Sequence, residues 1–162
     1  SFLCVPDRRG RRMKKYIITA AIIILIGAGG YLLEKKQYRA GPPEPAIAIG
    51  KQEVPAIRGT YCWSSMLKSI CVDTAAPPGM ISFDNHKPVT AAPGTEVTID
   101  FDKKPLKDSI HLSRWLNEEE SLQVPLKGNK FLLPDEKGTY VYDVSANWDN
   151  GDAVYAFVIE VK

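Results

Sequence analysis

Apolar and polar positions divide the chain into two unlike parts. Residues 16–33, which read YIITAAIIILIGAGGYLL, hold eighteen positions without a charged side chain. A helix of that length spans about 27 Å, close to the roughly 30 Å of a bilayer's hydrocarbon core. After residue 58 no comparable run occurs, and short segments rich in β-branched and aromatic residues are separated by Pro, Gly, Asn and Asp. The pattern predicts one N-terminal transmembrane helix followed by an all-β region.

Several short segments after residue 58 have the length and composition of β-strands and are bounded by turn-forming residues. Their density over about a hundred residues indicates a β-sandwich or a β-barrel. The segments are residues 59–63, 70–73, 79–83, 96–101, 109–116, 122–125, 130–133, 140–148 and 154–161.

The last two of these segments show the clearest alternation. Tyr140, Tyr142 and Trp148 share one face of the first segment, whereas mostly polar residues share the other. The first face is therefore predicted to be part of the core, and Phe157 continues the pattern in the second segment. An Asn-Gly dipeptide lies between the two segments, and this dipeptide is a strong signal for a hairpin turn.

Three places in the β-rich region resemble the immunoglobulin-like fold. Residues 94–101 (GTEVTIDF) look like its second strand, with Phe101 where the family has its first cysteine. Trp115 follows near the place of the family's core tryptophan. Residues 136–140 (EKGTY) are similar to the tyrosine corner, and Tyr142 takes the place of the second cysteine.

The resemblance implies an immunoglobulin-like sandwich over residues 78–162, with Phe101, Trp115 and Tyr142 in its core. Tyr142 is then expected to pack against Phe101 in place of the disulfide, and the Tyr140 hydroxyl to bond to the backbone of the preceding turn. The apolar residues around Trp115 alternate out of phase with it. Either a bulge shifts the register there or Trp115 faces outward.

Charge is distributed unevenly around the apolar segment. Residues 1–15 carry six Lys or Arg against one Asp, whereas residues 40–162 carry twelve against seventeen acidic residues. Because Lys and Arg concentrate on the cytoplasmic side, residues 1–15 are predicted to be a cytoplasmic tail, with the remainder outside the plasma membrane. A net acidic body does not attract phosphate backbones, so no nucleic-acid partner is expected.

Two interpretations of residues 16–33 stay open. They are an uncleaved signal anchor or a signal peptide removed after the small residues 28–30, and cleavage would release a secreted protein. The length of the segment and the charges behind it favour the anchor. Met13-Lys14-Lys15 is typical of the start of such a segment, so two interpretations of residues 1–12 also stay open: an over-predicted start, or part of the basic cytoplasmic tail.

Residues 34–56 are predicted to be a proline-rich linker. Prolines 42, 43, 45 and 55 favour extended backbone and disfavour a packed helix. The linker would act as a stalk that holds the next domain away from the bilayer.

Two cysteines, Cys62 and Cys71, fall outside the predicted membrane, and Cys4 precedes it. Oxidising conditions permit a disulfide there, and we predict that Cys62 and Cys71 close a small β element over residues 57–77. A redox or metal-binding pair is the alternative. Spacing argues against it, because redox dithiols usually sit two residues apart and structural zinc needs four ligands.

Two groups of residues are candidates for a binding surface. Tyr61, Trp63 and Met66 surround the predicted disulfide loop and either form an aromatic surface or cover one end of the sandwich. An acidic run is either a docking patch for a basic partner or a solvated connection between strands. The run consists of Glu118, Glu119 and Glu120.

No catalytic motif occurs in the sequence, so no catalytic residue, cofactor or metal is assigned. A copper site would use two His, one Cys and usually a Met. His86, His111, Cys71 and Met80 supply these types, but not clustered on one loop as in cupredoxins. A metal-handling domain and a small envelope enzyme or enzyme inhibitor are the alternatives to a binding module.

A second resemblance covers more of the chain. The basic start, the hydrophobic segment and residues 59–63 (GTYCW), 71–74 (CVDT) and 151–157 (GDAVYAF) look like a group of uncharacterised membrane-anchored envelope proteins of Gram-positive bacilli. The resemblance to that group implies a location and a fold, but it implies no activity. We therefore predict a single-pass, outward-facing module that binds a protein or a wall polymer.

Overall fold

The computed structural model describes residues 8–162, and the chain divides into a helical unit and a β-rich unit, Ala40–Lys162. Helix α1 (Arg8–Ala40) contains the segment Met13–Leu33, which is long and apolar enough to cross a membrane. None of the residues that the structure describes in that segment is buried inside the protein. A helix that is apolar on all sides is typical of a membrane span. The predicted helix is confirmed in length and composition, and it continues beyond residue 33.

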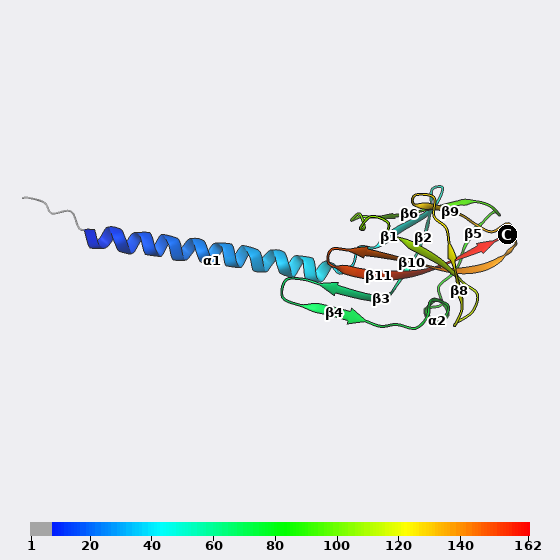
Figure 1. The fold of residues 1–162 in the computed structure, drawn as a ribbon, viewed down its shortest axis with the longest axis horizontal. Coiled ribbons are helices and arrows are strands. Elements are labelled where there is room, and N and C mark those ends of the chain that lie inside the picture. Colours follow the sequence, from blue (N-terminus) through cyan, green and yellow to red (C-terminus); the bar gives the residue numbers. More distant parts are fainter. Residues whose placement is uncertain (1–7) are drawn as a thin grey trace, which may run out of the picture. The chain divides into compact units, whose positions relative to one another are not determined.

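The β-rich unit is a sandwich of two sheets, and its smaller sheet has the strand order β2-β1-β6-β9 (Figure 1). Residues two apart share one face of a strand. Accordingly, Ile47 of one strand and Val97 and Ile99 of another are fully buried between the sheets. The strands of this sheet are β1 (Pro45–Ile49), β2 (Gln52–Val54), β6 (Glu96–Phe101) and β9 (Lys130–Leu132).

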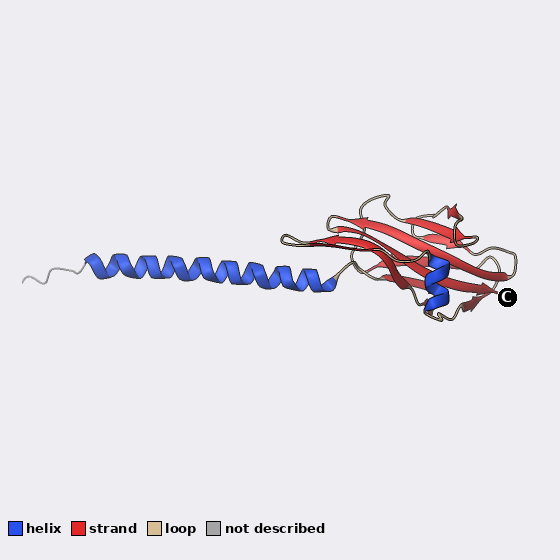
Figure 2. Cartoon of the chain, turned by 90° about the horizontal axis from the view of Figure 1, so that it is seen from below, coloured by secondary structure: helices blue, strands red, loops and turns tan. Residues whose placement is uncertain are grey.

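The larger sheet has the order β4-β3-β11-β10-β7-β8, and a short strand, β5, pairs parallel to β11. Figure 2 shows the β-rich unit with its strands in red and its short helix in blue. All other pairings in both sheets are antiparallel among the residues that the structure describes. The strands are β3 (Ile57–Ser64), β4 (Ser69–Val72), β5 (Val89–Ala91), β7 (His111–Trp115), β8 (Ser121–Val124), β10 (Gly138–Trp148) and β11 (Gly151–Val161).

The hairpin of β10 and β11 confirms the alternation expected at the end of the chain. Tyr142, Trp148 and Phe157 are buried in the core between the two sheets. The turn requires a glycine after Asn150, because Gly151 has φ +147° and a Cβ there would lie 1.9 Å from the carbonyl oxygen of Cys62. The sequence signal of the Asn-Gly dipeptide is thereby explained.

Residues 34–56 are not the extended linker that their prolines predicted. α1 continues through Ala40, and β1 and β2 form a hairpin whose Ile47 and Val54 are buried. The prolines do not interrupt this pairing, because Pro45 is the first residue of its strand and Pro55 follows the end of the next one. The first hairpin therefore belongs to the sandwich.

Residues 57–77 do not form a separate element before the sandwich. β3 pairs with β11, so the hairpin of β3 and β4 extends the larger sheet. The predicted strand over 79–83 is a helix, α2 (Pro77–Phe83), which starts with proline at its first two positions. Its Ile81 packs against Ala156 and Val158 on the outer face of the larger sheet.

Phe101 and Tyr142 do not pack against each other, which corrects the expected replacement of a disulfide. The ring of Phe101 lies 5.2 Å from that of Trp148, whereas Tyr142 lies 5.2 Å from Phe131 and 5.4 Å from Phe157. Phe101 is the last residue of its strand, so it faces one end of the core while Tyr142 fills the middle.

Trp115 lies outside the core between the sheets. The register of β7 against β10 is continuous, with Leu112 opposite Val144 and Trp115 opposite Val141. Because Leu112 faces the core, the alternation turns Trp115 to the outer face. It is half-buried there, and its indole N–H donates to the carboxylate of Asp143. The outward alternative is correct, and no bulge occurs in this pairing.

Candidate functional site

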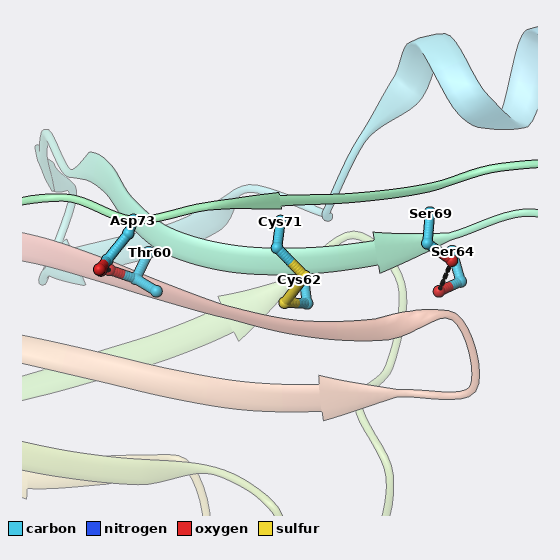
Figure 3. The surroundings of a disulfide bond; sticks show 6 residues. All are labelled: Thr60, Cys62, Ser64, Ser69, Cys71 and Asp73. Carbon is cyan, nitrogen blue, oxygen red and sulfur yellow. Dashed lines mark hydrogen bonds between the residues drawn. A yellow bond between two sulfur atoms is a disulfide. The ribbon is translucent and has the colours of Figure 1, made fainter.

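A disulfide joins the two strands of the hairpin of β3 and β4 (Figure 3). Cys62 and Cys71 are direct cross-strand partners, which confirms the predicted bridge. Polar pairs flank the bridge on both sides, so the disulfide belongs to a row of cross-strand contacts that hold an edge strand. The Thr60 hydroxyl donates a hydrogen bond to a carboxylate oxygen of Asp73 at 3.1 Å, and the hydroxyl oxygens of Ser64 and Ser69 are hydrogen-bonded at 2.8 Å.

The proposed aromatic surface around the disulfide does not form. Trp63 is only 3% exposed and packs edge-on against Trp148 with 5.9 Å between the ring centres. Tyr61 is half-buried against the core, whereas Met66 is 91% exposed at the tip of the hairpin. Trp63 is therefore part of the sandwich interior and Tyr61 lies at its border, so the three side chains do not form one exposed surface.

The acidic run forms an ordered turn between β7 and β8. The side-chain oxygen of Asn117 accepts the backbone N–H groups of Glu119 and Glu120, at 2.8 and 2.9 Å. The N–H of Leu116 donates to the carbonyl of Glu120 at 2.9 Å. Glu118, like the other two glutamates, is exposed. The turn thus holds three carboxylates in water on a fixed backbone.

A groove that the sequence did not reveal lies at the other end of the same two strands. It has a volume of about 710 Å³ and is bounded by the connection before β7 and the connection after β8. A smaller hollow of about 320 Å³ shares Val124 and Pro125 with it. We call these two spaces together the lysine-rimmed groove. Its apolar lining includes Pro105, Leu106, Ile110, Val124, Pro125 and Leu126.

Hydrogen bonds fix the wall of this groove to β10. The N–H of Leu106 donates to the carbonyl of Asn147 at 2.8 Å, and the Ser109 hydroxyl donates to the carbonyl of Leu106 at 2.8 Å. Ser109 is buried, and its oxygen also accepts the N–H of Asn147. Because these groups are partnered within the protein, the groove is formed without a ligand.

Lysines surround the groove in a unit that is otherwise acidic. Lys104 and Lys107 line the larger space, and Lys127 and Lys130 line the smaller one. Lys130 is paired with Glu96 at 2.7 Å, and Lys107 lies 4.0 Å from Asp108 in a highly exposed contact. Within the described residues, Lys104 and Lys127 make no ion pair. The groove therefore combines an apolar floor with positive charge.

Two loops at the open end of the β7–β8 hairpin make this site, and the pattern within either loop does not show that they meet. One contains the run Lys103-Lys104-Pro105-Leu106-Lys107, and the other contains Pro125-Leu126-Lys127. Each combines proline, leucine and lysine, and this shared composition is the signal that could have indicated the site. Their meeting depends on the pairing of β7 with β8.

The residues of the copper hypothesis are not brought together as a metal site. Cys71 is bonded to Cys62, so it lacks the thiolate that copper requires. His86 lies with its Nε2 atom 3.1 Å from the carbonyl of Pro55, whereas His111 lines the groove. Over residues 8–162 the structure contains no group of three or more His, Cys, Asp or Glu that could hold a metal ion.

Comparison with models of protein families, with curated proteins and with solved structures finds no match to this chain.

Proposed function

We propose that this protein is a membrane-anchored binding module of the cell envelope, with its sandwich outside the plasma membrane and no catalytic role. The apolar segment Met13–Leu33 would supply the anchor. The basic residues before it favour a cytoplasmic N-terminus. The resemblance to envelope proteins of Gram-positive bacilli agrees with this location.

We also propose that the sandwich is immunoglobulin-like. Its larger sheet places β8, β7, β10 and β11 side by side, and its smaller sheet pairs β6 with β1 and β9. This arrangement corresponds to the C′, C, F and G strands in one sheet and A, B and E in the other. The hydroxyl of Tyr140 donates to the carbonyl of Glu136 at 2.8 Å, which is the contact expected at a tyrosine corner.

The lysine-rimmed groove is the observation that carries the binding proposal. Ligand sites are usually preformed concave surfaces with an apolar lining and a few polar groups that set orientation. Here Lys104 and Lys127 would supply orientation, and Leu106 and Val124 the apolar contacts. The matching ligand is an anionic chain that also carries apolar groups, such as an acidic protein segment.

Fluorescence anisotropy of a labelled glutamate-rich peptide flanked by leucines tests this proposal on the full chain in detergent micelles. We expect binding that weakens with salt and falls at least about tenfold in the double variant Lys104→Glu/Lys127→Glu. The control variant Lys87→Glu changes an exposed lysine elsewhere and should bind normally. A peptide with glutamine in place of glutamate should bind weakly. Equal binding of both peptides, or no binding of either, would contradict the proposal.

A further inference from the structure

We propose that the lysine-rimmed groove binds the acidic turn between β7 and β8 of a second copy of this chain. This inference rests on the proposed function of the groove as a binding site and names its partner. It also assigns a role to the three consecutive glutamates, which make no ion pair within the residues that the structure describes.

The turn has the two properties that the groove requires. Glu118, Glu119 and Glu120 supply three exposed carboxylates. Leu116 and Leu122 flank them and are 50% and 45% exposed. The turn therefore presents negative charge between two apolar side chains.

The groove offers the complementary surface. Lys104 and Lys127 have no ionic partner among the described residues and can pair with carboxylates at the rim. Leu106 and Val124 on the floor can cover the flanking leucines. Opposite charge combined with matching apolar contacts provides both orientation and affinity.

The turn is also ordered before it binds. Asn117 accepts two backbone N–H groups of the turn, so the glutamates are carried on a fixed backbone. A preorganised ligand loses less conformational entropy when it associates. The groove is likewise held by the hydrogen bonds of Leu106 and Ser109.

The contact must be made between molecules. The groove lies at the end of the strand pair where Leu112 faces Val124, whereas the turn follows the end where Trp115 faces Ser121. The two pairs are three residues apart, or about 10 Å along the strands. Because a paired β-ladder cannot fold back on itself, the turn of one copy can reach only the groove of another.

Each contact joins unlike surfaces, the turn of one copy and the groove of another. A single contact leaves one groove and one turn free. These two surfaces can pair between the same two copies, which closes a two-fold dimer, or they can each bind a further copy.

Sedimentation velocity of the full chain in detergent micelles tests this inference. We expect the wild-type chain to associate with increasing concentration and to dissociate at high salt. The groove variant Lys104→Glu/Lys127→Glu and the turn variant Glu118→Lys/Glu119→Lys/Glu120→Lys should each remain monomeric. Mixed together, the two variants should associate again, because the acidic turn of the groove variant fits the basic groove of the turn variant.

The unchanged surfaces in that mixture are the turn of the groove variant and the groove of the turn variant. A chain that carries both sets of substitutions should regain association, because both charges are reversed together. The controls Lys87→Glu and Glu53→Lys change exposed charges elsewhere and should associate like the wild type.

Three results would overturn the inference: a wild-type chain that is monomeric at all concentrations, association that persists in both variants, or a mixture of the two variants that stays monomeric. The peptide experiment separates this failure from that of the proposed function. If the groove binds the glutamate-rich peptide but the chain does not associate, the groove is a binding site for another partner. If the groove does not bind the peptide and the chain does not associate, both proposals are contradicted.

Discussion

Tyr140 and Tyr142 share one face of β10 and differ in how they stabilise the fold. Tyr142 is buried between Phe131 and Phe157, so its replacement by alanine should leave a cavity and lower the free energy of unfolding by about 3–5 kcal/mol. Tyr140→Phe removes only the hydrogen bond to Glu136 and should cost about 0.5–1.5 kcal/mol. Urea denaturation of both variants measures the difference, and equal, negligible losses would contradict the assigned inner face.

Asp143 should make stability depend on pH. Burial raises the pKa of this carboxyl above its ordinary value of 3.8, and the hydrogen bond from Trp115 opposes the rise. In the pH window directly above 3.8 the folded state therefore binds more protons than the unfolded state. The contribution of this carboxyl to the free energy of unfolding therefore falls as the pH rises through that window.

Asp143→Asn removes this titration and keeps an oxygen that can accept the indole N–H. Relative to the wild type, the variant should therefore gain stability as the pH is raised from about 4 to 7. Urea denaturation at several pH values gives the difference in the free energy of unfolding between the two proteins. The contributions of the other carboxylates cancel in this difference. A difference that does not change with pH would show that Asp143 titrates normally.

The disulfide acts at the scale of a single element, the hairpin of β3 and β4. β4 lies at the edge of the larger sheet, and its only strand neighbour in the described part of the chain is β3. Replacing Cys62 and Cys71 together by serine should lower the free energy of unfolding by about 2–3 kcal/mol, since the closed loop no longer restricts the unfolded chain. Denaturation of the variant and of the oxidised wild type checks this, and an unchanged midpoint would contradict it.

Sequence patterns predicted the regular elements better than the irregular ones. β6 was predicted with its observed bounds, because its alternation places Val97 and Ile99 on one buried face. β1 and β2 were missed, since prolines near their ends hid the alternation of a short hairpin. α2 was mistaken for a strand because its few apolar residues are too short a run to show a helical period.

At the scale of the whole molecule, the sequence predicted the helix and the sandwich but not the groove. The apolar run of the helix and the local alternation of strands are properties of single segments. The groove depends instead on two loops that meet through strand pairing, and the pattern within either loop does not show that they meet. The disulfide was predictable because both cysteines lie on one short hairpin.

Labelling with a membrane-impermeant maleimide tests most directly the central claim that the sandwich is anchored outside the plasma membrane. Lys87 is exposed on the sandwich, so Lys87→Cys provides a reactive thiol there, whereas Cys4 precedes the apolar segment. In intact cells the account predicts labelling at position 87 and none at Cys4 until the membrane is permeabilised. Labelling of Cys4 with protection of position 87 would contradict the account.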